Sequence, residues 1–351
     1  MDIQQLLQLA VERQASDLHL VAGLPPHLRV EGVLFPVPAE TPLTAEQIDN
    51  FLRSILKNEQ SERFLVNKEL DFSLSFSDKA RFRINAYFQK GTPAASFRAI
   101  PLTVPTIDFL GLPSIVHSFT ALRQGLILVT GPTGHGKSTT LAAILDEINQ
   151  NRAEHIVTLE DPIEFILKPK KSIISQREMG QDTHSWQIAL RSILREDPNV
   201  LLIGEMRDFE TIAAALTIAE TGHLVFSTLH TNSAAQTIDR IVDVFPENQQ
   251  GQVKLQLAMV LEAVFSMRLV PGIDGKRFVA HELLLGTPAV RTVIRESKTH
   301  QIDGIIQTSG EIGMATLEKS LASFVREGKI SMETALSWTL RPEELTRMVK
   351  S

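Results

Sequence analysis

The stretch GPTGHGKST, residues 131–139, constrains the fold of this chain more than any other feature. It fits the pattern G-x-x-x-x-G-K-[ST] at every fixed position. An apolar run, Leu126–Val129, comes before it, and apolar residues at helical spacing follow Lys137. Glycines let backbone N–H groups converge on phosphate oxygens at a helix start, where the helix dipole favours anions. The stretch therefore predicts a nucleotide-binding loop between a buried strand and a helix.

Two side chains of this loop have defined chemical expectations. Lys137 is expected to reach the β- and γ-phosphates of a nucleoside triphosphate, and the Ser138 hydroxyl to ligate Mg²⁺. ATP and Mg²⁺ are the expected cofactors. The full set of residues expected to contact the nucleotide in the loop is Gly131, Thr133, Gly134, His135, Gly136, Lys137, Ser138 and Thr139.

The pattern around the loop predicts an α/β fold. Short apolar runs at His155–Leu159, Val200–Ile203 and Leu224–Ser227 alternate with helical patterns at about 185–196 and 209–221. Such alternation favours a parallel sheet covered on both faces. Beyond residue 233 the pattern is mainly helical, with a hairpin centred on residues 273–275 and a helix beginning at 287–288.

The first hundred residues differ from the rest. Leu70–Phe76 and Arg81–Phe88 alternate apolar and polar residues, with a turn predicted at 77–79. Thr44 and Gln47 have the spacing of a capping box before an apolar helix face. We expect an α+β domain at 1–100, a proline-rich linker at 101–113, a nucleotide-binding core at 114–286 and a helical region at 287–351.

A nucleotide loop needs acidic partners for the metal and for the attacking water. Glu205 follows the apolar run 200–203, and Gly204 stands where an aspartate that binds Mg²⁺ is usual. Glu160 and Glu164 lie in a group of carboxylates after the run 155–159. Glu205 is suited to orienting or deprotonating water, and Glu164 to catalysis or the metal. Helix capping and surface charge are the competing interpretations of each carboxylate.

Histidines and arginines complete the candidate set. His223 and His230 flank the apolar run 224–229, and a neutral donor at such a position is suited to sensing a γ-phosphate, although a lone histidine is more often structural. Arg83 lies on a predicted strand of the first domain and Arg98 follows it. Surface ion pairs are the default for both, but either can supply charge to phosphates.

Composition excludes several classes of protein. There are no cysteines, so disulfides and cysteine-based zinc sites are excluded. The formal net charge is −6, with two tryptophans and one tyrosine, so no nucleic-acid partner is expected and a helicase or recombinase is disfavoured. No lid rich in arginine follows the loop, which disfavours a small-molecule kinase. The N-terminus lacks the pattern of a secretory signal.

Four blocks, GPTGHGKSTTLAA, TLEDPIEF, LLIGEMRD and TGHLVFSTLHTNSA, resemble the Walker A, Asp box, Walker B and His box of the type II/IV secretion ATPases. The N-terminal blocks resemble that family's PAS-like domain, and the stretch AVRTVIRE at 289–296 resembles a motif of its pilus retraction ATPases, the PilT group. The resemblance implies a PAS-like α+β domain followed by a RecA-like P-loop ATPase core with a helical C-terminal region.

The resemblance also implies a function. It is that of a homohexameric ATPase motor, cytoplasmic and peripheral to the inner membrane at the pilus base. Such a motor retracts type IV pili, for twitching motility, through an inner-membrane platform protein of the PilC type. Residues that match the family's functional positions are Glu164 and Glu205 for hydrolysis, His230 with His223 near the γ-phosphate, and Arg83 and Arg98 at a domain interface. The motif at 289–296 is expected to serve retraction rather than hydrolysis.

Two departures leave alternatives open. His135 replaces the usual serine of the loop, and Val290 and Thr292 alter the common form of the 289–296 motif. These changes leave an accessory retraction ATPase of the PilU type, working with a paralogous pilus ATPase, as one alternative. A nucleotide-gated scaffold with little hydrolysis is another.

Overall fold

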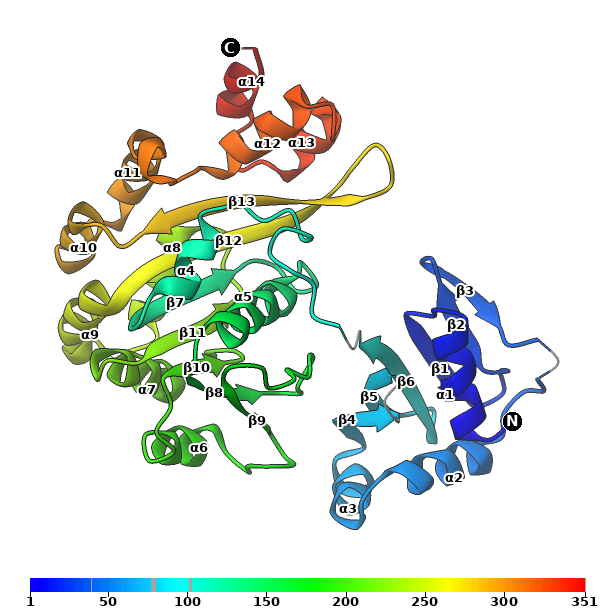
Figure 1. Ribbon diagram of the computed structural model, residues 1–351. Helices are drawn as coiled ribbons and strands as arrows, with labels where there is room; N and C mark the ends of the chain where they lie inside the picture. Colours follow the sequence, from blue (N-terminus) through cyan, green and yellow to red (C-terminus); the bar gives the residue numbers. More distant parts are fainter. Residues whose placement is uncertain (39, 77–79, 101–102, 351) are drawn as a thin grey trace. The chain divides into compact units, whose positions relative to one another are not determined.

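The computed structural model describes residues 1–38, 40–76, 80–100 and 103–350, and the chain forms two compact units (Figure 1). The first contains Met1–Thr103 together with Pro162–Ile166, and the second contains Val104–Asp161 and Leu167–Ser351. Each unit buries its own hydrophobic core. No helix within the described ranges is long and apolar enough to cross a membrane.

The first unit is an antiparallel sheet backed by helices. Its strand order is β3-β2-β1-β6-β5-β4, and every neighbouring pair is antiparallel. The strands are β1 (Asp17–Val21), β2 (His27–Val30), β3 (Val33–Pro36), β4 (Glu69–Phe76), β5 (Ala80–Gln89) and β6 (Thr92–Ile100). The helices are α1 (Ile3–Glu12), α2 (Ala45–Ile55) and α3 (Asn58–Asn67).

Alternation along β5 explains how this unit folds. Phe82, Ile84 and Ala86 are buried in the core, whereas Arg81 and Arg83 lie on the other face. The predicted strands at 70–76 and 81–88 are therefore confirmed; the turn expected at 77–79 lies outside the described residues. The capping box is confirmed too, because Gln47 N–H donates to Thr44 Oγ1 at 3.1 Å and Thr44 N–H to Gln47 Oε1 at 2.8 Å.

The second unit is a mixed sheet with the order β13-β12-β7-β11-β10-β8-β9. All neighbouring strands are parallel except β12 and β13, which form an antiparallel hairpin. The strands are β7 (Gly125–Thr130), β8 (His155–Glu160), β9 (Ile173–Glu178), β10 (Val200–Ile203), β11 (Leu224–Leu229), β12 (Leu261–Pro271) and β13 (Arg277–Leu285). The parallel strands predicted around the loop are confirmed.

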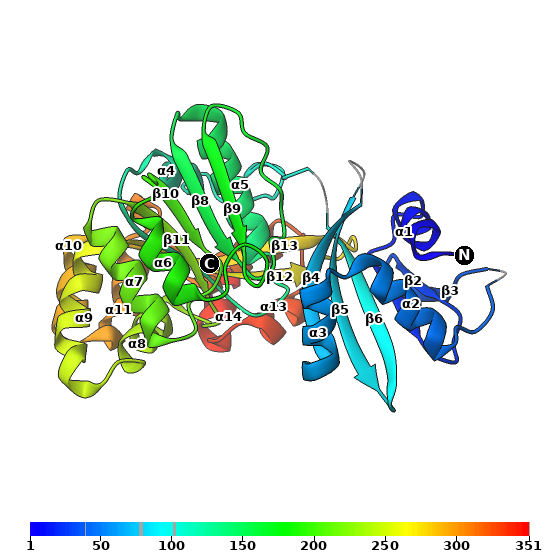
Figure 2. The ribbon, with the colours of Figure 1, turned by 90° about the horizontal axis from the view of Figure 1, so that it is seen from below.

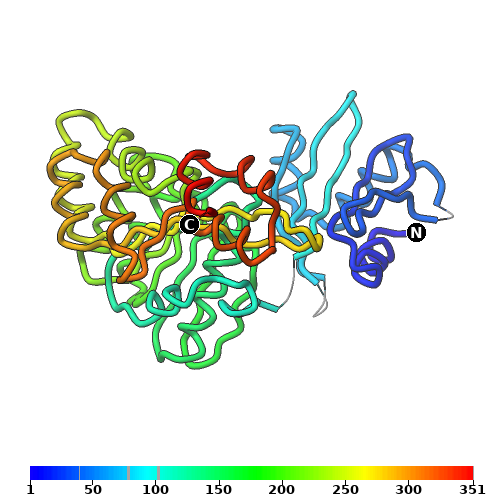
Figure 3. The backbone as a smooth tube through the Cα atoms, turned by 90° about the horizontal axis from the view of Figure 1, so that it is seen from above, coloured from blue at the N-terminus to red at the C-terminus, as the bar shows by residue number. Residues whose placement is uncertain are grey.

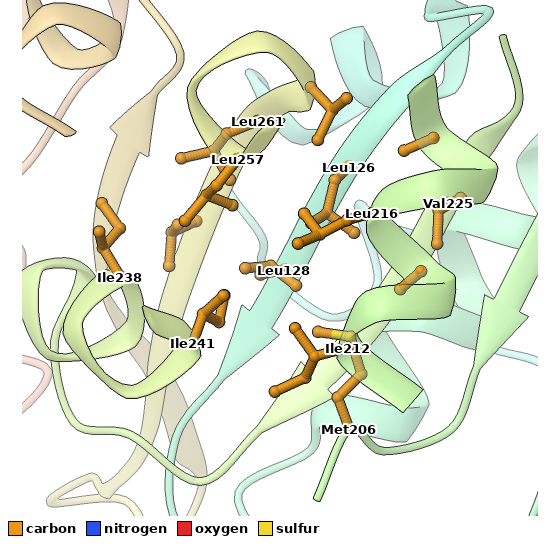
Figure 4. Packing of buried hydrophobic residues seen from close by; sticks show 14 of the residues in the cluster. Leu126, Leu128, Met206, Ile212, Leu216, Val225, Ile238, Ile241, Leu257 and Leu261 are labelled. Atoms are coloured by element: carbon orange, nitrogen blue, oxygen red, sulfur yellow. The ribbon is translucent and has the colours of Figure 1, made fainter. Parts of the chain in front are cut away.

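Helices cover both faces of this sheet (Figure 2). The helices on one face are α4 (Val116–Ala121) and α5 (Lys137–Asn151); those on the other are α6 (Trp186–Ile193), α7 (Phe209–Glu220), α8 (Ala234–Asp243) and α9 (Glu247–Val260). Leu126 and Leu128 of β7 pack against α7 (Figure 4), whereas Ile127 and Val129 join the core beneath α5. A strand buried on both faces has no polar side to show, which is why this run is continuously apolar.

The C-terminal part is helical apart from the long hairpin. Its helices are α10 (Pro288–Arg295), α11 (Ile302–Thr308), α12 (Leu317–Arg326), α13 (Met332–Trp338) and α14 (Pro342–Lys350), with short 3₁₀ turns at Thr299–Gln301 and Gly310–Ile312. Figure 3 shows the last helices, in red, over the yellow hairpin, and Leu317 and Leu321 share a core with Val270 and Ala280. Residues 104–113, expected in the linker, group with this unit because Ile107 and Leu112 lie in its core.

Candidate active site

The loop leaves β7 in a conformation that only glycine adopts easily. Gly131, Gly134 and Gly136 have φ values of +138°, +80° and +87°. A Cβ on Gly131 would lie 2.3 Å from the carbonyl oxygen of Met267 on β12, so the loop also packs too closely there for a side chain. Helix α5 begins at Lys137 with Gly136 at its N-cap. The loop's backbone N–H groups therefore gather at a helix N-terminus, as the sequence predicts.

Lys137 is buried at the centre of this loop. Its ammonium donates to the carbonyl oxygens of Gly131 at 2.8 Å and Pro132 at 3.0 Å. Ser138 and Thr139 follow on the first turn of α5. A hydroxyl oxygen is the kind of hard donor that Mg²⁺ prefers, so Ser138 fits the metal expected there.

A chain of polar side chains connects Lys137 to the ends of two neighbouring strands. His230, directly after β11, has Nδ1 at 3.4 Å from Lys137 Nζ and 3.3 Å from Thr133 Oγ1. Its Nε2 lies 3.1 Å from Glu205 Oε1, after β10. An ammonium only donates, so Nδ1 of His230 accepts from it. The Nε2–H proton then points to Glu205, which defines the tautomer of His230.

Glu205 is held as a carboxylate. Burial alone would raise the pKa of Glu205, but the hydrogen bond from Arg207, at 2.9 Å, and the nearby His230 outweigh burial and lower it. The group is therefore ionised at neutral pH. Arg207 and His230 take one oxygen each, which holds the carboxylate plane in place. Such a carboxylate orients water well and is a weakened general base.

Glu160 lies at the end of β8, beside the end of β10. Its Oε1 accepts from Thr158 Oγ1 at 2.7 Å and Gln176 Nε2 at 3.2 Å. A Cβ on Gly204 would lie 3.1 Å from the Leu159 carbonyl and 3.4 Å from Glu160 Cα. The glycine that replaces the usual aspartate therefore lets these two strand ends approach, and Glu160 remains as the neighbouring carboxylate.

His223 does not join this group. It precedes β11, where its Nδ1 contacts Thr221 Oγ1 and the Ile218 carbonyl, each at 3.0 Å. Because β7 and β11 are parallel and in register, the loop and His230 lie at one end of them and His223 at the other, roughly 20 Å away for a six-residue strand. The structure therefore keeps His223 and His230 apart within one chain, and the expectation that His223 supports His230 is not met there.

The remaining candidates belong to the first unit. Arg83 NH1 lies 3.4 Å from Glu164 Oε1, and Arg81 Nε donates to the Ile163 carbonyl at 3.3 Å. Arg83 and Arg98 are cross-strand partners on β5 and β6. Arg98, however, donates to Asp17 Oδ1 at 3.1 Å, and the buried Asp17 also pairs with Arg29 at 3.5 Å. Glu164 is therefore an ion-pair partner of Arg83 here.

The type II/IV secretion system protein family matches residues 1–337. The chain belongs to this family. It is 48% identical to the Pseudomonas aeruginosa type IV pilus retraction ATPase PilT, over 98% of this chain and 99% of that protein. It is 38% identical to the same organism's type IV pilus ATPase PilU, over 100% of this chain and 92% of that one.

Solved structures of the family agree with the fold. The crystal structure of the pilus retraction motor PilT with bound ADP superposes with a TM-score of 0.92, at 43% identity over 99% of both chains. The Legionella pneumophila ATPase DotB matches with a TM-score of 0.84, at 27% identity, over 95% of this chain and 93% of that one. The chain is thus a PilT-like member of a nucleotide-binding ATPase family, and the expected α/β fold is confirmed.

Sequence reasoning missed some partners of the family's site residues. Arg207, which pairs with Glu205, comes two residues after it in the chain, so the sequence could have predicted this ion pair. Gln176, which holds Glu160, and Met267, which excludes a side chain at Gly131, carry no local signal. Gln176 lies on β9 and Met267 on β12, and only folding pairs these strands with β8 and β7.

Proposed function

We propose that this chain is an ATP-hydrolysing motor that retracts type IV pili. The observation that carries the proposal is the hydrogen-bonded series Lys137, His230 and Glu205, which links a phosphate-binding loop to an ionised carboxylate. The similarity to PilT over nearly the whole of both chains supports pilus retraction as the work done.

Each residue of the series has a role. The loop amides and Lys137 bind the β- and γ-phosphates, and Ser138 holds Mg²⁺, which neutralises charge on the phosphates. Glu205 orients the attacking water. Catalysis of phosphoryl transfer depends more on such positioning than on abstraction of a proton from the water. His230 lies between Lys137 and Glu205, so it is placed to respond to the γ-phosphate.

The assembled motor extends this proposal beyond one chain. We propose a homohexamer at the inner membrane that acts on a platform protein of the PilC type, with Arg83 and Arg98 adding charge near the phosphates in the ring. An accessory motor of the PilU type remains the second candidate, because His135 and the altered 289–296 motif depart from the usual pattern. The higher identity to PilT than to PilU favours the main motor.

Phosphate release from ATP, measured over a range of protein concentrations, tests the proposal. Specific activity should rise with concentration as sites assemble. Glu205→Gln keeps the size of the side chain but removes its charge, and it should lower kcat roughly 10²–10⁴-fold while ADP still binds. Arg83→Ala should also lower kcat, whereas Arg53→Ala, at an exposed ion pair on α2, should not.

One result would count against the motor, and another against the role of the two arginines. If the wild-type protein binds ATP but releases no more phosphate than Glu205→Gln, a nucleotide-gated scaffold is the better description. If Arg83→Ala and Arg98→Ala both hydrolyse ATP normally, these arginines have no part in the site.

A further inference from the structure

Strand β12 extends past the strand that it lies beside. Its parallel pairing with β7 ends at Ser266 opposite Thr130, but β12 continues to Pro271. Beyond Ser266 it keeps β13 on one side, while the β7 side faces the phosphate-binding loop. A backbone N–H on that side needs an acceptor from another part of the chain.

His135 provides that acceptor. The backbone N–H of Leu269 donates to Nδ1 of His135 at 2.9 Å. A ring nitrogen that accepts carries no proton, so His135 is bound here in its neutral form. Burial, followed by the charges of Lys137, Arg268 and Arg277, lowers the pKa of His135, in keeping with this state.

The ring of His135 also contacts the C-terminal region. Its centroid lies 5.5 Å from that of Trp338, the last residue of α13, at an interplanar angle of 59°. The geometry is within the range of a favourable aromatic contact.

Two charged groups, the half-buried Arg268 and the buried Glu318, hold the backbone around Trp338. Arg268 of β12 donates to the Trp338 carbonyl at 2.6 Å. Glu318 of α12, only 1% exposed, accepts from Thr339 Oγ1 at 2.8 Å and from Leu340 N–H at 3.2 Å. The hairpin and α12 therefore hold the backbone that carries the indole, and the loop contacts the indole through His135.

We propose that His135 is a positioning residue that ties the phosphate-binding loop to β12 and to Trp338, so that nucleotide binding and the seating of α13 are coupled. The proposal rests on the nucleotide site proposed above. A loop built around three glycines with positive φ has much conformational freedom, and both contacts of His135 restrict it. Coupling is reciprocal, so a nucleotide in the loop also acts on α13.

Trp338 fluorescence tests the coupling. The chain has two tryptophans, and Trp186→Phe leaves Trp338 as the single reporter. Titration with ADP should change its emission with a midpoint equal to the dissociation constant from calorimetry. His135→Ala should abolish this change and weaken ADP binding about three- to tenfold. His135→Asn, whose amide oxygen can replace Nδ1, should recover most of the affinity but not the emission change.

The control variant is His184→Ala, which removes an exposed histidine far from β12 in the sequence and should change neither signal. The proposal is overturned if His135→Ala binds ADP with wild-type affinity, or if Trp338 still responds to ADP in that variant. If His135→Ala fails to fold, His135→Asn carries the test: it should bind ADP nearly as well as the wild type while Trp338 emission stays unchanged, and an emission change of wild-type size would overturn the proposal. A failure of the nucleotide-site proposal gives a different result from a failure of the coupling. If the loop is not the nucleotide site, Lys137→Ala should bind ADP as well as the wild type.

Discussion

At the scale of single residues, Gly131 joins two requirements that alanine cannot meet. Its φ is +138° and its missing Cβ makes room for the Met267 carbonyl. We expect Gly131→Ala to lower the free energy of unfolding by more than about 2 kcal/mol and to abolish ADP binding. Gly134→Ala is the matched control, because its φ is +80° but nothing lies within 4 Å of its Cβ. Urea denaturation and calorimetry measure both effects; equal losses in the two variants would contradict the packing argument.

Glu282 is a second residue with a measurable consequence. It is buried on β13 and accepts from the Ala234 N–H, at the start of α8, at 2.7 Å. Burial raises the pKa of Glu282 from 4.5 to about 7, against the effect of that hydrogen bond. Because the pKa is raised on folding, this group favours the folded state below about pH 4.5, and that contribution is lost as the pH rises through about 7.

Glu282→Gln removes this titration and keeps an acceptor for Ala234. Between about pH 5 and pH 8 the wild type should lose on the order of 2–3 kcal/mol of unfolding free energy relative to the variant. Urea denaturation at both pH values measures the difference. Glu311→Gln, at an exposed position, should follow the wild type. Parallel pH profiles for wild type and Glu282→Gln would refute the assignment.

At the scale of elements, one arginine of α10 bonds to three backbone carbonyls and a carboxylate outside the helix. Arg291 donates to the carbonyls of Gly286, at 2.7 Å, and Ala258, at 2.8 Å, and pairs with Glu262 at 2.8 Å. It also donates to the Met259 carbonyl. Ala258 and Met259 are in the last turn of α9, where carbonyls lack helical partners and attract a cation.

Arg291→Ala should therefore destabilise the chain by about 2–3 kcal/mol and expose α10 to hydrogen exchange. The Arg295 side chain donates to Thr292 on the same helix at 3.0 Å, so Arg295→Ala should change stability by less than about 0.5 kcal/mol. Because the motif at 289–296 is expected to serve retraction, ATP turnover should survive in both. A loss of turnover in Arg291→Ala without loss of stability would argue against that expectation.

At the scale of the whole molecule, the two cores predict two unfolding transitions. ADP at about one hundred times its dissociation constant should stabilise the unit that contains the loop by about 2.7 kcal/mol. Asp17→Asn, which removes the charge paired with Arg29 and Arg98, should lower the transition of the first unit alone. Scanning calorimetry separates the two effects. As a control, ADP should not raise the unfolding temperature of Lys137→Ala. A single transition that moves with both ADP and Asp17→Asn would contradict independent unfolding of the two units.

The sequence alone determined the elements and the loop, because those signals are local. The pattern of glycines indicates where the loop needs positive φ angles, and the spacing of apolar residues indicates whether a segment is a strand or a helix. On this basis the strands around the loop, the capping box at Thr44, the hairpin at 273–275 and the helix that begins at 287–288 followed from short stretches. The roles of Lys137 and Ser138 are predictions from the same kind of local pattern.

Only the tertiary structure decided which of the candidates meet. His230 follows β11 and reaches the loop, whereas His223 precedes the same strand and lies at the opposite end of the sheet. Arg98 is paired with Asp17, and Trp338 reaches His135 across some 200 residues of chain. Strand order and direction bring such residues together or keep them apart, and these are properties of long-range pairing that no local pattern of residues contains.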